Sequence, residues 1–335
     1  MKIGVIGAGA WGTALSNLLA GKGLTVDLWA FEKEVCRDII EERENKLFLP
    51  GINLSANIRP SNNLDKVAAD KDLLLIVVPS HVFRSVATRL VQHPTERTII
   101  VSATKGIENK THLRMSGILH QLLPPRLHDQ VAVLSGPSFA REVAQKMPTA
   151  VTVAARNMQL ARTVQMTFAT GYFRVYTSYD LVGVELGGAL KNVIAVAAGI
   201  SDGLGLGYNT RAALITRGAT EIQRLGIRLG ANPKTFMGLS GIGDLVLTCT
   251  GPLSRNWTVG NKLGQGMKLE EILAGMRSVA EGVRTTKSVY NMARKIGVEM
   301  PITEKVYSIL YEGLDPREAL GMLMNRNLKH ELDDE

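Results

Sequence analysis

The chain begins with a short apolar strand that runs directly into a glycine-rich turn. The predicted strand covers residues 2–6, and Gly7, Gly9 and Gly12 follow it in GxGxxG spacing, with a helix opening near Trp11. Gly7 permits the tight turn, Gly9 lets a pyrophosphate approach the backbone, and Gly12 lets helix and strand pack closely. The free N–H groups and positive dipole of the helix start favour an anion. The pattern predicts a dinucleotide site, and a glycine turn that binds nothing is the alternative.

Short apolar runs continue to alternate with helical stretches through the first half of the chain. Several of these runs are apolar throughout, which is typical of strands that helices cover on both faces. The alternation predicts a doubly wound Rossmann domain with a parallel sheet over residues 1–180. The further predicted strands are TVDLWA at 25–30, LLLIVV at 73–78, TIIVSA at 98–103, VAVLS at 131–135, AVTVA at 150–154 and YFRVYTS at 172–178.

Beyond residue 180, β-branched runs give way to helical patterns punctuated by glycine and proline. We therefore expect an all-α second domain over residues 181–335. Its predicted helices are 181–201, about 209–230, 253–265, 282–296 and 302–312. In the first half, the polar segment 45–60 either closes over a ligand or, as the favoured interpretation, is a passive surface loop.

Composition narrows the possible partners and compartments. There are 39 Lys and Arg against 31 Asp and Glu, a net charge of +8 that suits an anionic partner. The basic residues are scattered and aromatics make up 5% of the chain, which disfavours nucleic acid. Cys36 and Cys249 are too few for a disulfide framework or a four-ligand zinc site. The apolar stretch 181–200 is interrupted by Glu185 and Lys191, so we expect no membrane span, and without a signal-peptide pattern we expect a cytoplasmic protein.

The end of the second predicted strand should determine which dinucleotide binds. An acid here accepts the adenosine ribose hydroxyl of NAD, whereas a cation accommodates the 2′-phosphate of NADP. Glu32 and Lys33 compete for this position, and Phe31 before them offers only an apolar face. The sequence predicts NAD or NADP as the cofactor and leaves the choice open.

One lysine, Lys191, lies in a helix that is otherwise apolar and rich in small residues. It either snorkels to solvent at the helix edge or is a proton-transferring base whose pKa falls through burial and neighbouring positive charge. Asn192 beside it adds a fixed hydrogen-bonding group. His81 is expected to be a loop histidine, and no set of His, Cys, Asp and Glu has metal-ligand spacing, so no metal is expected.

A second polar cluster lies in the glycine-rich segment 240–257. Arg255 suits a phosphate through its bidentate guanidinium, Asn256 adds an amide, and Asp244 can hold an ammonium in place. A capped helix start with surface charges is the alternative. Two further segments, SATKGIE at 102–108 and SGPSFARE at 135–142, each follow a predicted strand and should lie at the carboxyl edge of the sheet, where ligands bind.

Together these segments resemble the bacterial-type NAD(P)-dependent glycerol-3-phosphate dehydrogenases over nearly the whole chain. The motifs are GAGAWGTAL, VVPSHVF, ATKGIE, SGPSFARE, ELGGALKNVIAVAAGISDGLG, NTRAALITRG, GDLVLTCT, SRN and VAEGVRTT. The resemblance implies a Rossmann domain and a 6-phosphogluconate-dehydrogenase-like helical domain, with dihydroxyacetone phosphate or sn-glycerol 3-phosphate bound between them. It further implies a homodimer that supplies sn-glycerol 3-phosphate for phospholipid synthesis.

The resemblance also assigns site residues. It implies Lys191 as the proton-transferring lysine, Lys105 as a second active-site lysine, and Asp244 and Thr248 as their polar support. The implied substrate contacts are Lys105, Gly136, Ser138, Lys191, Asp244, Ser254, Arg255 and Asn256. The implied cofactor contacts are Gly7, Gly9, Ala10, Trp11, Gly12, Phe31, Lys105, Ala140, Arg255, Val279 and Glu281. Phe31 stands where the family often has Arg or His.

Two other functions remain as alternatives. A β-hydroxyacid or ketoacid dehydrogenase on the same scaffold would bind a carboxylate in place of the phosphate. A non-catalytic NAD(P)-binding regulator would need the dinucleotide turn, but neither Lys191 nor the 240–257 cluster, and the presence of both disfavours it.

Overall fold

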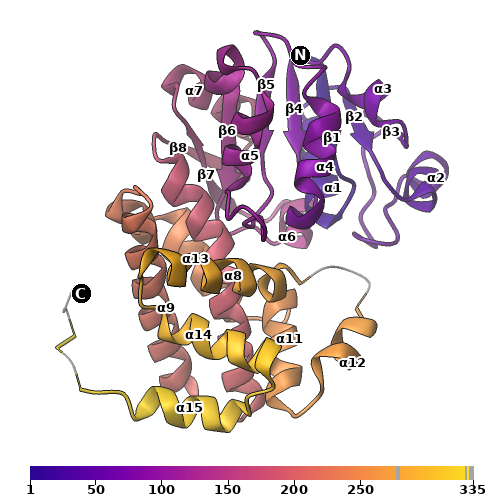
Figure 1. The fold of residues 1–335 in the computed structure, drawn as a ribbon. Coiled ribbons are helices and arrows are strands. Elements are labelled where there is room, and N and C mark those ends of the chain that lie inside the picture. Colours follow the sequence, from indigo (N-terminus) through magenta and orange to yellow (C-terminus); the bar gives the residue numbers. More distant parts are fainter. Residues whose placement is uncertain (277–279, 329, 332–335) are drawn as a thin grey trace.

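The first half of the chain forms one eight-stranded sheet, and the second half forms the helical domain drawn below it in Figure 1. The computed structural model describes residues 1–276, 280–328, 330 and 331. The strand order is β3-β2-β1-β4-β5-β6-β7-β8. The strands are β1 (Ile3–Ile6), β2 (Val26–Trp29), β3 (Ile58–Ser61), β4 (Leu73–Ile76), β5 (Ile99–Ser102), β6 (Val131–Ser135), β7 (Thr149–Ala155) and β8 (Phe173–Ser178).

Helices cover both faces of this sheet because its central strands are apolar on both. Val5 and Leu75 face a core shared with α1, α2 and α7, whereas Ile6 and Leu74 face a core shared with α3, α4 and α5. Successive strand residues point to opposite faces, so the predicted doubly wound domain is confirmed. Its helices are α1 (Ala10–Gly21), α2 (Lys33–Glu42), α3 (Leu64–Ala68), α4 (Ser80–Leu90), α5 (Met115–Leu122), the 3₁₀ turn η1 (Pro125–Gln130), α6 (Ala140–Ala144) and α7 (Met158–Phe168).

Two features of the sheet differ from the prediction. β3 begins inside the segment 45–60 that we interpreted as a loop, and Pro60 fits there because proline is tolerated on an edge strand. β7 runs antiparallel to β6, although we expected a parallel sheet. The connection between them contains only the five-residue α6, which is too short to carry the chain back across the sheet as a parallel crossover requires.

The second half is helical, as predicted, and the five predicted helices are present with slightly different ends. They correspond to α8 (Leu181–Gly203), α9 (Tyr208–Arg228), α11 (Arg255–Gly264), α13 (Glu281–Ile296) and α14 (Pro301–Tyr307), the last continuing into the π-helix η4 (Ser308–Glu312). Periodicity missed the shorter elements, which contain few turns in which a pattern can repeat. These are the 3₁₀ turn η2 (Pro233–Met237), the π-helix η3 (Leu239–Gly243), α10 (Asp244–Cys249), α12 (Leu269–Ala274) and α15 (Pro316–Met324).

The long helix α8 passes from one domain into the other. Its first turns lie on the sheet, where Leu181 and Val184 join a small core with Val133 of β6 and Ala154 of β7. Its later turns form the centre of the helical core. By length and composition α8 could cross a bilayer, but 94% of its apolar window is buried inside the protein. This helix therefore carries Lys191 from the sheet into the region between the domains.

Candidate active site

The glycine turn after β1 is built for close approach to its backbone. Gly7 has φ +118°, which favours glycine, and a Cβ on Gly12 would overlap the carbonyl oxygen of Gly7. A Cβ on Gly9 would meet no atom of the described structure within 4 Å, so space is open above this residue. Gly9 is the N-cap of α1 and Ala10 its first residue, which leaves the first N–H groups of the helix facing that space.

Two further residues shape this turn. Trp11 packs against the sheet core near Phe173, and its indole Nε1 is buried without a hydrogen-bond partner in the part of the chain described. Asn45, which the sequence analysis missed, is fully buried and donates through Nδ2 to Ala8 O and Thr13 Oγ1, both at 2.8 Å. Asn45 is the first residue of a polar segment and carries no local signal for this contact.

Phe31 and Glu32 follow β2 at the carboxyl edge of the sheet. The Phe31 side chain is 77% exposed and meets Trp29 edge to face, with ring centroids 6.2 Å apart. Glu32 is the N-cap of α2, but its side chain makes no capping hydrogen bond. Lys33 is exposed. These three side chains thus lie after β2, where the sequence analysis expected the ribose of a dinucleotide, and within the described residues none is fixed by a hydrogen bond or ion pair of its own.

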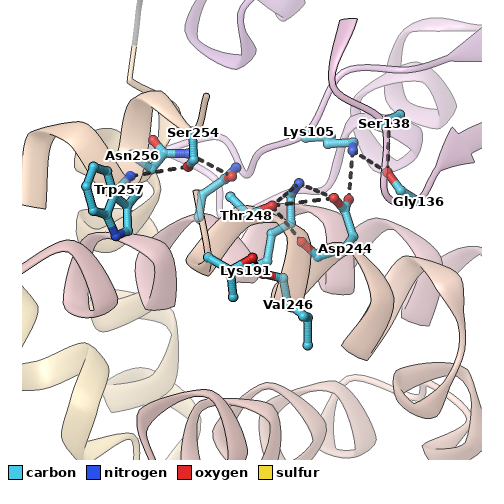
Figure 2. Close-up of polar contacts among 12 residues, drawn as sticks. Lys105, Gly136, Ser138, Lys191, Asp244, Val246, Thr248, Ser254, Asn256 and Trp257 are labelled. Carbon is cyan, nitrogen blue, oxygen red and sulfur yellow. Dashed lines mark hydrogen bonds and ion pairs between the residues drawn. The ribbon is translucent and has the colours of Figure 1, made fainter. Parts of the chain in front are cut away.

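Asp244 is the centre of a polar cluster between the domains (Figure 2). Its side chain is fully buried, and its two carboxylate oxygens bind two different lysines. Lys105, after β5, lies 2.7 Å from Oδ2, and Lys191 of α8 donates to Oδ1. Thr248, one turn further along α10, accepts from Lys191 at 2.8 Å and donates to the Asp244 carbonyl oxygen at 2.6 Å. One carboxylate thus joins a lysine from each domain.

Lys191 has a strongly perturbed acidity. Burial lowers the pKa of Lys191 to about 7, Asp244 opposes this shift, and the neighbouring Lys105 ammonium adds to it. The residue is only 6% exposed, so the snorkelling interpretation is wrong for this lysine. An amine with a pKa near neutrality can both give and take a proton at ordinary pH.

The segment after β6 supplies an acceptor for the second lysine. Lys105 Nζ donates to Gly136 O at 3.0 Å, and Ser138 Oγ donates to the same oxygen at 2.9 Å (Figure 2). Gly136 has φ +142°, and a Cβ there would lie 2.9 Å from Val151 Cα, so the turn requires glycine. Gly136 O and Asp244 Oδ2 accept two of the three Lys105 protons, which leaves one without a hydrogen bond among the described residues.

The start of α11 brings Ser254, Arg255 and Asn256 to the same region. Ser254 Oγ caps the helix by accepting from Trp257 N at 3.2 Å, as the structural alternative proposed. Arg255 is exposed to solvent, as the alternative of surface charges expected, but desolvation by the surrounding protein still lowers the pKa of its guanidinium, with Glu281 acting in the opposite direction. An exposed guanidinium can bind an anion through two parallel N–H groups.

Asn256 is held by the protein on both sides of its amide. Its Nδ2 donates to Asn192 Oδ1 at 2.8 Å, and its Oδ1 accepts from Gly282 N at 2.8 Å. Asn192 follows Lys191 on α8, so this amide network connects the three helices α8, α11 and α13. The sequence alone gives no sign that these two asparagines meet.

The remaining implied cofactor contacts occupy two places. Ala140 opens α6, which packs beside α1, and Glu281 opens α13. Both carboxylate oxygens of Glu281 accept from Ser80, the backbone N–H at 3.0 Å and the hydroxyl on the other oxygen. Val279 lies outside the described residues.

The expectation that His81 lies in a loop is wrong. His81 is not a loop residue but lies in the first turn of α4, where burial and Arg284 lower its pKa and Glu281 raises it. Proline at the preceding N-cap, Pro79, starts this helix earlier than the strand-end pattern suggested. No group of three or more His, Cys, Asp and Glu side chains suited to a metal occurs among the described residues.

Family models and relatives agree along the whole chain. The N-terminal model of NAD-dependent glycerol-3-phosphate dehydrogenase matches residues 2–161, and the C-terminal model matches residues 180–321. Glycerol-3-phosphate dehydrogenase (NAD(P)+) of Syntrophobacter fumaroxidans is 60% identical over 331 residues, which cover 99% of this chain and 97% of that protein. The counterpart in Geobacter metallireducens is 58% identical over 330 residues, 98% of each chain. The crystal structure of glycerol-3-phosphate dehydrogenase from Coxiella burnetii has a TM-score of 0.91 at 42% identity and covers 97% of this chain and 99% of that one. The chain therefore belongs to the NAD-dependent glycerol-3-phosphate dehydrogenase family and is an NAD(P)-dependent oxidoreductase acting on a CH–OH group.

Proposed function

We propose that Lys191 moves the proton in the reversible reduction of dihydroxyacetone phosphate to sn-glycerol 3-phosphate. The observation that carries this proposal is the buried Lys191 amine on Asp244, with its pKa near 7. The ketone must gain a hydride at carbon and a proton at oxygen. The nicotinamide of NAD(P)H, when bound, supplies the hydride.

The residues at the first turn fit a dinucleotide. The open space above Gly9, the free helix N–H groups after it and the unpartnered indole N–H of Trp11 all suit an anionic ligand with further acceptors. We propose that Gly7, Gly9 and Ala10 hold the pyrophosphate through their backbone. Trp11, Gly12, Phe31, Lys105, Ala140, Arg255, Val279 and Glu281 complete the proposed set of cofactor contacts.

The protein's own part in the chemistry is to manage charge and one proton. In the reductive direction the Lys191 ammonium gives a proton to the substrate oxygen and is left as a neutral amine. Asp244 and Thr248 fix two of its three protons, which directs the remaining one toward the substrate. Lys105 stabilises the same developing charge through its free proton. In the oxidative direction Lys191 begins neutral and accepts the hydroxyl proton.

The substrate's phosphate requires a separate anion site. Arg255 is the group we propose for it, because a guanidinium can form two parallel hydrogen bonds to phosphate oxygens. Gly136 and Ser138 line the proposed substrate side, and Ser254 and Asn256 hold the start of α11 in place. An α-ketoacid bound at Arg255 would present a carboxylate beside the ketone instead of a phosphate.

Further properties follow from the family resemblance. We propose that the enzyme works in the cytoplasm as a homodimer and supplies sn-glycerol 3-phosphate for phospholipid synthesis. Sedimentation of the purified protein checks the dimer, because a monomer at micromolar concentration would contradict it.

The proposed chemistry predicts opposite pH dependences for the two directions. Because reduction needs protonated Lys191, kcat/KM for dihydroxyacetone phosphate should fall as pH rises through about 7. Oxidation needs the neutral amine, so kcat/KM for sn-glycerol 3-phosphate should rise over the same interval. The assay follows cofactor absorbance from pH 5.5 to 9, and the substrate phosphate, with a second pKa of about 6, titrates only near the acid end of this range. Parallel profiles in the two directions would contradict the role of Lys191, and equal rates with α-ketoacids would favour the carboxylate alternative.

A further inference from the structure

We propose that Glu185 is a positioning residue for the proton-transferring lysine, which it serves by anchoring α8 on the nucleotide-binding domain. Glu185 lies six residues before Lys191 on the same helix, about 9 Å along the axis at 1.5 Å per residue. Among the described residues, its side chain forms its hydrogen bonds and ion pair with Arg114 and Ser116, away from the Asp244 cluster and the glycine turn. The inference rests on the proposed role of Lys191 and concerns how the chain holds that amine in place.

The Glu185 carboxylate is buried and bound entirely to the start of α5. Its side chain is 4% exposed, Oε1 accepts from Ser116 N at 2.7 Å, and Oε2 accepts from Ser116 Oγ at 2.5 Å. Arg114 forms an ion pair with Oε2. These donors lie about seventy residues earlier in the chain and in the other domain. The contact is therefore a directional connection between α8 and the sheet domain.

The Glu185 carboxylate also caps the start of α5, which has no cap of its own. Arg114 is the N-cap of this eight-residue helix and provides no side-chain cap, and the first turn contains no acid. The unpaired N–H groups and positive dipole at a helix start favour a carboxylate. Glu185 supplies it from α8, and Arg114 compensates its buried charge. Both helices are thus held by the same side chain.

The next residues of α8 touch the two segments that build the site. A Cβ at Gly187 would overlap the carbonyl oxygen of Ser240, four residues before Asp244, and a Cβ at Gly188 would overlap Ser135 Oγ, just before Gly136. Such close backbone packing fixes how near α8 lies to these segments. It does not by itself fix the rotation of the helix, because van der Waals contact is not directional. The hydrogen bonds of Glu185 supply a directional constraint toward the nucleotide-binding domain, as the Asn192 amide does toward the helical domain.

A small rotation or slide of α8 would separate Lys191 from Asp244 and Thr248. A misplacement of about 1 Å at a reacting group can reduce a rate by about 10²-fold. Loosening would also admit water to the amine. Since burial is the largest cause of its lowered pKa, the pKa of Lys191 would then rise. A structural cap with no positioning role would change neither the rate constant nor its pH dependence.

The test replaces Glu185 by glutamine and compares it with a matched variant. Glu185→Gln keeps the size of the side chain and one acceptor but removes the charge that pairs with Arg114. We expect kcat for the reduction to fall about tenfold, an intermediate loss on the scale of a misplaced group, with KM for both substrates within about threefold. The pH midpoint of the reduction should move upward from about 7.

The control is Glu221→Gln, the same chemical change at another buried helical glutamate that caps a neighbouring helix. Glu221 of α9 is 3% exposed and caps α14 by accepting from Ile302 N and from the backbone and hydroxyl of Thr303. Its contacts stay within the helical domain. We therefore expect this variant to lower the melting temperature while kcat and the pH midpoint stay at their wild-type values.

A folded Glu185→Gln enzyme with wild-type kcat and an unchanged pH midpoint would overturn the proposal, because the carboxylate would then be only a cap. If this variant does not fold, Ser116→Ala removes one of the three donors and keeps the backbone N–H. We expect the same upward shift at smaller size, and its absence would equally overturn the proposal. Wild-type turnover in Lys191→Ala would instead contradict the proposed function.

Discussion

The two domains contribute to the candidate active site by different means. The nucleotide-binding domain offers mainly backbone: the turn at Gly7 and Gly9, the first N–H groups of α1 and the carbonyl of Gly136. The helical domain offers side chains, and it buries the charges of Lys191 and Asp244 almost completely. Lys105 links the two domains, because its ammonium donates to the Gly136 carbonyl of the first domain and to the Asp244 carboxylate of the second.

This difference determines which kind of mutation would inactivate each part of the site. A backbone site depends on space, so an added Cβ is enough to block it while all charges remain. A site of buried charges depends on pairing, because an ammonium taken out of water is stable only beside a correctly placed partner. Binding of the dinucleotide and transfer of the proton should therefore be separable by mutation.

The largest expected effect comes from removing the buried amine. Lys191→Ala should abolish turnover while cofactor binding stays nearly intact, because Lys191 lies on Asp244 and the glycine turn is elsewhere. Loss of proton transfer alone lowers a rate by about 10² to 10⁴. Steady-state kinetics and titration of NADH or NADPH by fluorescence measure the two properties separately. A variant that retains more than about a tenth of wild-type kcat would remove Lys191 from the mechanism.

The converse variant blocks the backbone site and spares the charges. Gly9→Ala should lower kcat/KM for the cofactor by roughly 10- to 100-fold, the loss of one to two charge-assisted hydrogen bonds. Gly9 has φ −65°, and nothing in the described structure lies within 4 Å of the added Cβ, so the melting temperature should fall only slightly, because alanine is a poorer N-cap than glycine. Gly12→Ala is the contrasting variant, because its Cβ would overlap Gly7 O and destabilise the fold. Wild-type cofactor kinetics in Gly9→Ala would show that no ligand approaches this residue.

Sequence reasoning found the parts of the molecule whose signals are local. The GxGxxG turn, the apolar central strands and the long helices each repeat a pattern within a few residues, and the structure has them. The sequence analysis missed the antiparallel direction of β7 because the path of the connection from β6 leaves no pattern in the sequence of β7. It missed the edge strand β3 because the residues of β3 do not show which strand they pair with. The fold class could therefore be predicted from the sequence, but the antiparallel β7 and the additional edge strand β3 could not.

The same distinction holds for the site. Lys191 and Asp244 stood out because a charge in an apolar or glycine-rich segment is unusual, and the structure brings them together. Asn45 and Glu185 act through partners 32 to 71 residues away, so no local pattern could single them out. Glu281 was named through the resemblance, yet its bond to Ser80 spans 201 residues and needed the fold. Long-range polar contacts are what the sequence alone does not provide.

A smaller effect is expected at the phosphate site, where charge can be kept and geometry changed. Arg255→Lys should raise KM for dihydroxyacetone phosphate roughly five- to tenfold, since a bidentate fork becomes a point contact at a cost of about 1 kcal/mol or slightly more. The kcat should change less than KM, because Lys191 and Asp244 do not contact this side chain. Initial rates over a range of substrate concentrations measure both. An unchanged KM would show that another group binds the phosphate.

The smallest expected effect concerns the choice between NADH and NADPH. This choice depends on the side chains that follow β2 and not on the backbone of the glycine turn. Phe31 cannot donate to a 2′-phosphate, and Glu32 would repel it while accepting the 2′-hydroxyl of NADH. Lys33 is exposed, and a lone exposed cation gains little against solvent and salt.

We therefore expect NADH to be a competent cofactor, with at most a weak preference for NADPH. Phe31→Arg should shift the ratio of kcat/KM toward NADPH by roughly two- to fivefold, the range of a solvent-exposed charge pair of up to about 1 kcal/mol. Phe31→Leu is the matched control, because it removes the ring without adding a donor and should leave the ratio unchanged. A wild-type preference for NADPH above about 10²-fold, roughly 2.7 kcal/mol, would mean that residues outside this turn recognise the phosphate. In that case the selectivity for NADPH would come from side chains outside the turn at Phe31. Cofactor choice would then depend on side chains even though the nucleotide-binding domain holds the rest of the dinucleotide mainly through its backbone.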